Sequence, residues 1–134
     1  MIIKEKDTIE PNLAELERLA SLPNIAKSVR SQIEKEQKIL KAGHHGEKQS
    51  AYFINFYYSE SKNWAIIHDL RVEYSGFVAQ IDHLLINRFL DIYVLETKHY
   101  SRGIKITERG EFLTSFNKHY SAIESPIEQN KRHI

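Results

Sequence analysis

Two carboxylates and a lysine occupy positions in this sequence where apolar strand residues are expected. Asp82 interrupts the apolar stretch 77–86, and Glu96 and Lys98 directly follow the apolar stretch 92–95. Side chains two apart in a strand lie on the same face, so Glu96 and Lys98 are expected to project together. Burial of an unpaired carboxylate costs several kcal/mol. These three side chains therefore indicate either a set of ion pairs or a site that binds a cation.

A short segment, residues 87–91, separates the two apolar stretches and predicts a tight turn. Pairing Ile86 with Ile92 across this turn places Asp82 opposite Glu96, with Cβ atoms about 5 Å apart. Two carboxylates at that distance repel each other unless positive charge lies between them. A hard cation such as Mg²⁺ would supply that charge, because it binds one or two carboxylates together with water and phosphate oxygens. A register slip of one residue would turn Asp82 to the other face of the sheet.

The ion-pair interpretation is favoured when this pattern is taken alone. An Asp followed by Glu-x-Lys is short and arises often by chance. A Glu and a Lys two apart at the end of a strand usually form a solvated pair of little energetic value. A functional interpretation therefore needs further residues in support.

The elements that would position these side chains change in type near residue 42. Before it, apolar residues at helical spacing predict a helix over 12–21, with Asn12 as its N-cap, and a second helix from Asn24 that Gly43 ends. After it we expect a third helix over 46–57, and a last helix that begins at Pro126 with Ser125 as N-cap. The expected strands are 64–68, 71–74, 77–86, 92–98, 104–106 and 112–116. This order predicts an α+β domain with helices packed on a mostly antiparallel sheet, in which 92–95 forms a central strand covered on both faces.

Four short motifs, taken in order, resemble the nuclease-related domain, or NERD, family. They are Gly46-Glu47, Gln80-Ile81-Asp82-His83, Glu96-Thr97-Lys98 and Pro126-Ile127-Glu128-Gln129. That family is grouped with the PD-(D/E)XK nucleases, so the resemblance implies a restriction-endonuclease-like core. The resemblance covers residues 43–134 and leaves 1–42 as an N-terminal helical extension. Because Gln129 stands close to the end of this sequence, we expect the final helix of the core to be cut short.

The resemblance implies a role for each matching residue. Asp82 and Glu96 match metal ligands, with Glu47 as a third acidic ligand, although Ile81 replaces the proline of the wider superfamily. Lys98 matches the lysine that orients or activates the attacking water, and Gln129 matches a glutamine that positions Lys98 or contacts a phosphate. The implied function is a nuclease that depends on Mg²⁺ or Mn²⁺ and hydrolyses phosphodiester bonds of DNA, with RNA as the other candidate substrate.

Three residues after the Glu-x-Lys motif could contact the nucleic acid. Tyr100, Arg102 and Lys105 combine an aromatic ring with two cations, a set that suits a sugar-phosphate backbone. A solvated loop explains them equally well. Two other functions also stay open: a nucleic-acid-binding module of the same fold with weak or partner-dependent catalysis, and an interaction domain in which the motif is fortuitous.

Histidines and aromatic residues support no second site. His44 and His45 are interpreted as a solvated helix end rather than a zinc site, since no thiol assists them. His83 should face away from Asp82 and serve packing. Core packing is also expected for the aromatic residues near the end of the third helix. These are Tyr52, Phe53, Phe56, Tyr57 and Tyr58.

Composition sets the remaining limits. The 134 residues suit one domain, and they contain no cysteine, which excludes disulfides and thiolate chemistry and suits a cytoplasmic protein. A net charge of +1 excludes a histone-like coating protein but allows a local basic patch. No apolar run is long enough for a membrane span, so no membrane partner is expected. Apolar residues in 1–42 must pack on something, either the core, a partner domain or a second copy.

Overall fold

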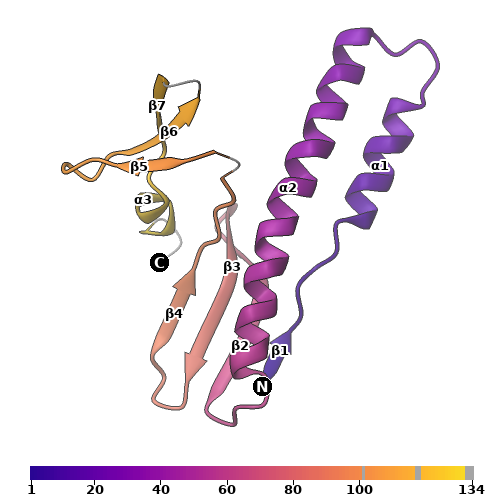
Figure 1. Cartoon of the computed structure of the whole chain (residues 1–134). Coiled ribbons are helices and arrows are strands. Elements are labelled where there is room, and N and C mark those ends of the chain that lie inside the picture. The colour runs from indigo at the N-terminus through magenta and orange to yellow at the C-terminus, as the bar shows by residue number, and fades with distance from the viewer. Residues whose placement is uncertain (101, 117–118, 132–134) are drawn as a thin grey trace.

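The structure is a computed structural model that describes residues 1–100, 102–116 and 119–131. In these residues, three helices and seven strands form an α+β arrangement with an N-terminal helical region, as predicted. Figure 1 shows a long helix lying along one sheet, with a second small sheet and a short helix beside it. The elements, in chain order, are β1 (Ile2–Lys4), α1 (Glu10–Ala20), α2 (Lys27–Tyr58), β2 (Trp64–Tyr74), β3 (Phe77–Asn87), β4 (Ile92–Leu95), β5 (Ile104–Ile106), β6 (Phe112–Phe116), β7 (His119–Ile123) and α3 (Pro126–Lys131).

The two sheets differ in topology. The first has the order β1-β2-β3-β4, in which β2, β3 and β4 are antiparallel and β1 pairs with β2 in parallel. The second has the order β5-β6-β7 and is wholly antiparallel. β2 and β3 form the longest pairing, joined by Ser75 and Gly76, which both have positive φ as a two-residue type I′ turn requires.

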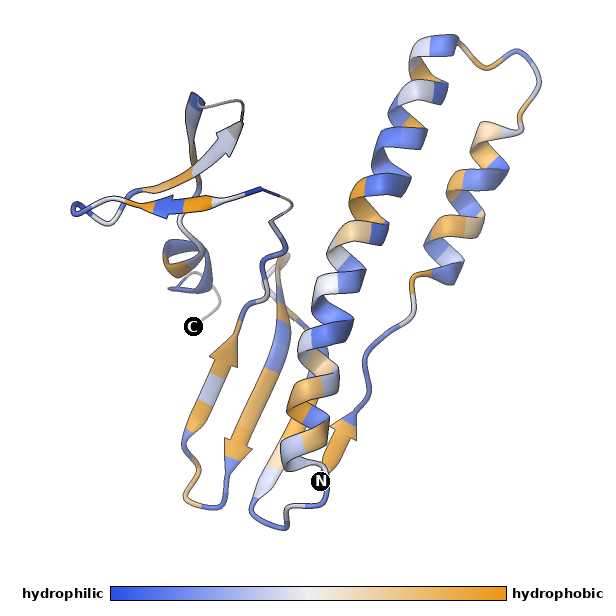
Figure 2. Ribbon diagram, viewed as in Figure 1, coloured by the Kyte–Doolittle hydropathy of each residue, from blue (hydrophilic) through white to orange (hydrophobic). Residues whose placement is uncertain are grey.

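One continuous helix replaces two of the predicted ones. α2 runs over 32 residues without a break at Gly43, so the prediction that Gly43 ends a helix is wrong. An interior glycine costs only about 1 kcal/mol, which the packing of the rest of the helix offsets. His44 and His45 therefore lie within α2 rather than at a helix end. Figure 2 shows that apolar residues of α2 gather most where the helix passes the sheet.

The starts of the two shorter helices were predicted with different success. α1 starts at Glu10, with Pro11 in its first turn and Ile9 as N-cap, so Asn12 lies inside the helix. This start agrees with the preference of proline for the first helical turn. The N-cap expected for the last helix is confirmed, because the Ser125 hydroxyl accepts the Glu128 N–H at 3.4 Å.

In the first sheet, β2 and β3 lie at the centre and β4 lies at one edge. Ile92, Tyr93 and Leu95 are 39–63% exposed, so the prediction of a strand covered on both faces is wrong for 92–95. A continuous apolar run does not by itself tell a central strand from an edge strand that other elements cover in part. The buried side chains lie instead on α2, β2 and β3, and the apolar ones are Ile33, Ala51, Ile66, Ile81 and Leu85.

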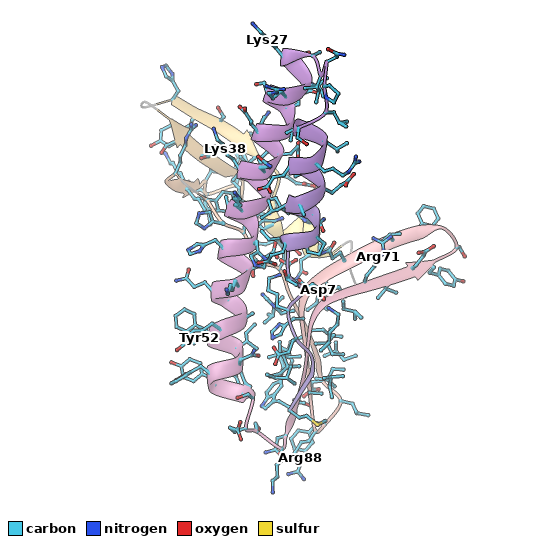
Figure 3. The ribbon with its side chains drawn as sticks, turned by 90° about the vertical axis from the view of Figure 1, so that its right-hand side faces the viewer. Asp7, Lys27, Lys38, Tyr52, Arg71 and Arg88 are labelled. Atoms are coloured by element: carbon cyan, nitrogen blue, oxygen red, sulfur yellow. The ribbon has the colours of Figure 1, made fainter. Side chains whose placement is uncertain are left out.

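Most of the aromatic cluster of α2 lies on the surface. Tyr52, Phe53, Phe56 and Tyr57 are 51–72% exposed and contact one another, so the expectation of core packing is wrong for these four. Figure 3 shows Tyr52 on the side of α2 that points away from the first sheet. Tyr58 alone packs as predicted, with its ring 5.3 Å from that of Trp64. Among the described helices none is both long and apolar enough to cross a membrane.

Candidate metal site of a nuclease-related domain

The predicted register between the two strands of the site is correct. Ile86 pairs with Ile92, and the ladder continues to His83 opposite Leu95, where β4 ends. Asp82 is the next residue of β3, and it is buried, with 8% of its surface exposed. Its Oδ2 accepts the backbone N–H of Thr97 at 2.7 Å. This bond fastens the segment after β4 to the strand that carries Asp82.

Glu96 lies between two hydrogen-bond donors from different elements. Its Oε1 is 2.8 Å from Nζ of Lys98 and accepts an N–H from Nε2 of Gln129, also at 2.8 Å. Gln129 comes from α3, which a hydrogen bond of Asn130 to the Val94 carbonyl (3.1 Å) holds against β4. Gln129 thus contacts the carboxylate of the Glu-x-Lys motif, whereas the sequence predicted a contact with Lys98 or a phosphate.

Glu47 forms an ion pair with Lys6, a residue that no sequence motif indicates. Nζ of Lys6 donates to Glu47 Oε2 at 2.6 Å and to both carboxylate oxygens of Asp69 at 2.9 and 3.0 Å. The side chains of Lys6 and Asp69 are only 11% and 6% exposed. Burial opposes the charge of Lys6, but the hydrogen bonds to both carboxylates outweigh it and raise the pKa of Lys6. A residue of the 1–42 extension thereby becomes part of the site.

Asp69 owes its position to an irregular backbone. It stands in β2 between His68, which pairs with His83, and Leu70, which pairs with Ile81. Its φ of 49° lies in the left-handed region, which Asp tolerates better than most residues. Asp69 Oδ2 also accepts the N–H of Asp7 at 2.7 Å. The sequence pattern predicts a break between two strands at this point and indicates no role for Asp69.

Gly46 allows a close crossing beside Glu47. A Cβ at Gly46 would lie 2.8 Å from the Cβ of His99, closer than two such atoms approach in proteins. The segment that leaves the Glu-x-Lys motif therefore crosses α2 at Gly46, and the ring of His45 packs edge-to-face on that of His99 at 6.2 Å. The physical basis of the Gly46-Glu47 motif is that the glycine admits the crossing segment and the next residue carries the acid.

A buried pair of histidines lies behind Asp82. His68 and His83 are 0% and 1% exposed, and their Nδ1 atoms are 2.8 Å apart. Nε2 of His68 is 2.9 Å from Oδ1 of Asn55, and Nε2 of His83 is 3.1 Å from Oγ1 of Thr97. Burial lowers the pKa of both rings, that of His83 to about 4. His83 is buried, as predicted, but it also bonds a residue of the Glu-x-Lys motif.

Comparison with known proteins agrees with this arrangement. The sequence profile of the family described as the nuclease-related domain, NERD, matches residues 42–134. The chain belongs to the NERD family. Neither the curated proteins nor the solved structures contain a significant match. The NERD family is usually grouped with the PD-(D/E)XK nucleases. Asp82, Glu96 and Lys98 follow one another along this chain in the order of that motif.

The carboxylate oxygens of this NERD domain are the type of donor that a hard divalent cation uses. Burial raises the pKa of Asp82 to about 6, a shift that the Thr97 N–H opposes and the charges of Glu96 and Glu47 reinforce. Asp82 and Glu96 offer the two carboxylates that Mg²⁺ or Mn²⁺ uses alongside water and phosphate. In the described part of the chain, no three His, Cys, Asp or Glu side chains converge into a ready metal cage. Glu47 is less suited to be a third metal ligand, because Lys6 already neutralises its charge.

The effect of Asp82 on stability is expected to depend on pH. The folded NERD domain holds the Asp82 proton at a pKa of about 6 against 3.8 for an ordinary Asp, so this contribution to the free energy of unfolding falls as pH rises between those values. His83 has the opposite effect on the free energy of unfolding, because its pKa is about 4 against 6.5 and its contribution falls as pH decreases through that window.

The variant Asp82→Asn should therefore gain stability with rising pH more steeply than the wild type. Urea denaturation at several pH values measures both slopes, and a Glu60→Gln variant, changed at an exposed site, should follow the wild type. Equal slopes for Asp82→Asn and the wild type would contradict the raised pKa.

The candidate nucleic-acid contacts lie beyond the metal site. Tyr100 is half-buried, and Arg102 and Lys105 are exposed on the way into the second sheet of the NERD domain. Nζ of Lys105 lies 5.3 Å from the centre of the Tyr120 ring, a cation–π contact. The interaction of these residues with a nucleic acid stays a prediction.

A cavity of about 490 Å³ adjoins the acidic side of the site. Lys6, Glu47 and Asp69 line it together with Gln80 and His44. Its wall is thus shared by the NERD core and the N-terminal extension.

Proposed function

We propose that this NERD domain is a divalent-metal-dependent nuclease that hydrolyses phosphodiester bonds of DNA. The observation that supports it most strongly is the convergence of four side chains from β3, from the segment after β4 and from α3. Asp82 is joined to that segment through the Thr97 N–H, and Glu96 contacts both Lys98 and Gln129. Membership of the NERD family supports a nuclease-related function in general.

In this proposal Asp82 and Glu96 hold Mg²⁺ or Mn²⁺ through their carboxylate oxygens. The bound ion would offset negative charge on the phosphate and make a water molecule more acidic. Gln129 keeps Glu96 in place through its amide N–H. Glu47 would complete the shell or recruit a second ion after releasing Lys6.

In this proposal Lys98 acts on the attacking water. Its side chain is 33% exposed, so Nζ can contact both Glu96 and the solvent. An ammonium group there stabilises the negative charge that develops on the water oxygen as it attacks the phosphorus. Tyr100, Arg102 and Lys105 would hold the DNA backbone on the path that leads away from Lys98.

Cleavage of DNA by the purified chain tests the proposal. With Mg²⁺ or Mn²⁺, supercoiled and linear DNA are expected to be cut, and removal of the ion by EDTA should stop the reaction. RNA and single-stranded DNA in the same assay would define the substrate. DNA binding without cleavage in either metal would contradict the proposal and favour the alternative, a binding module that needs a partner for catalysis. One observation favours that alternative, namely the ion pair that Lys6 forms with Glu47.

A further inference from the structure

The hydrogen bonds behind Asp82 form one chain with a defined direction. Nδ2 of Asn55 donates to Oε2 of Glu5 at 3.4 Å, which leaves Oδ1 of Asn55 to accept from Nε2 of His68. A neutral imidazole carries one proton, so Nδ1 of His68 must accept, and Nδ1 of His83 donates to it. Nε2 of His83 is then an acceptor, and the Thr97 hydroxyl donates to it.

This series of hydrogen bonds ends at Thr97, which also bonds Asp82. The side chain of Thr97 bonds His83, and the backbone N–H of the same residue bonds Asp82 Oδ2 at 2.7 Å. Thr97 lies beyond Leu95 and Glu96, and Leu95 is the last residue of β4 that pairs with β3, so the β3–β4 ladder does not reach Thr97. The hydroxyl bond therefore supplies an orientation that strand pairing does not.

We propose that His68 and His83 are positioning residues, which fix the Thr97 hydroxyl and so keep the Thr97 N–H on Asp82. The inference rests on the proposed function in one respect, since Asp82 is taken as a metal ligand. Groups that orient a metal ligand through hydrogen bonds commonly change metal affinity by about 10- to 100-fold when they are removed. Thr97 would thus act as an outer-shell residue of the site, although it lies within the Glu-x-Lys motif itself.

Two isosteric pairs of variants separate positioning from packing. Thr97→Val removes the hydroxyl and keeps the shape, whereas Thr97→Ser keeps the hydroxyl. His68→Leu removes the acceptor for His83, whereas His68→Asn keeps an oxygen near the place of Nδ1. Thr114→Val, a threonine replacement in β6, is the matched control.

Calorimetry with Mn²⁺ and the amide proton shift of residue 97 in metal-free protein are the two measurements. We expect Thr97→Val and His68→Leu to bind Mn²⁺ about tenfold more weakly and to lose the downfield shift that a carboxylate acceptor causes. Thr97→Ser, His68→Asn and Thr114→Val should resemble the wild type in both. Unchanged Mn²⁺ affinity and an unchanged amide shift in Thr97→Val would overturn the proposal, and this variant decides alone if His68→Leu does not fold. The amide shift needs neither metal nor DNA, so a wild type that fails to cleave DNA would refute the proposed function without deciding the role of the histidines.

Discussion

Replacing Glu96 by Gln is expected to reduce metal-dependent cleavage of DNA by about a thousandfold. The variant keeps the shape of the side chain and an oxygen that can accept from Gln129, but it removes the charge that would bind the metal ion. Stabilisation of transition-state charge by such an ion is worth several kcal/mol, and about 4 kcal/mol corresponds to a factor of a thousand in rate. Initial rates of plasmid cleavage under saturating Mn²⁺ measure the effect.

Three comparisons make this result specific to the site. Glu60→Gln, at an exposed position after α2, should cleave like the wild type. Lys98→Met should also lose activity but should still bind Mn²⁺, because both carboxylates remain. Thermal unfolding should show that Glu96→Gln is folded, since Lys98 is exposed enough to turn toward water. Full activity of Glu96→Gln together with undiminished Mn²⁺ binding would show that Glu96 is not a ligand.

Replacing Lys6 by Met is expected to destabilise the fold by about 3 kcal/mol at neutral pH. Removing one partner of a buried ion pair leaves an uncompensated charge and typically costs about 3–5 kcal/mol. Asp69 is the more buried of the two carboxylates that lose Lys6, and it keeps the N–H of Asp7, which favours the lower end of that range. Urea denaturation of the metal-free protein measures the loss.

A neighbouring lysine provides the control. Lys4 pairs with Asp7 at 2.7 Å on the surface, with side chains 38% and 67% exposed, so Lys4→Met should cost less than about 1 kcal/mol. Adding Glu47→Gln to Lys6→Met should recover part of the loss, because one of the two unpaired charges is then absent. A loss in Lys6→Met no larger than in Lys4→Met would show that the three-way contact contributes little to stability.

Local signals allowed the β3–β4 part of the site to be predicted. The turn between Asn87 and Asp91 is short, and the side chain of Asn87 accepts the N–H groups of Phe89 and Asp91 at 2.8 and 3.0 Å. A turn held in this way leaves one register for the strands, and Asp82 then lies beside the Glu-x-Lys segment. The start of α3 was equally local, since Ser125 and Pro126 are strong helix-initiation signals.

Contacts between distant segments were not predictable in the same way. β1 is three residues long and pairs in parallel with a strand more than sixty residues later. No sequence pattern near Ile2 therefore predicts this pairing. That pairing leads the chain to Lys6, which then contacts Glu47 and Asp69. Asp69 likewise faces Lys6 through a left-handed backbone that residue type permits but does not demand. The partners of Glu47 therefore depended on tertiary structure alone.

The unbroken helix α2 runs across the start of the stretch that matches the NERD family. The stretch that sequence comparison identifies begins at residue 42, in the middle of a helix that starts at Lys27. A fragment cut at that boundary would lose Ile33 from the core, the edge strand β1, and the cation of Lys6 that neutralises Glu47 and Asp69. The stretch that matches the family and the set of residues that pack together thus have different boundaries, and the acidic site takes part of its charge balance from a residue before the matched stretch.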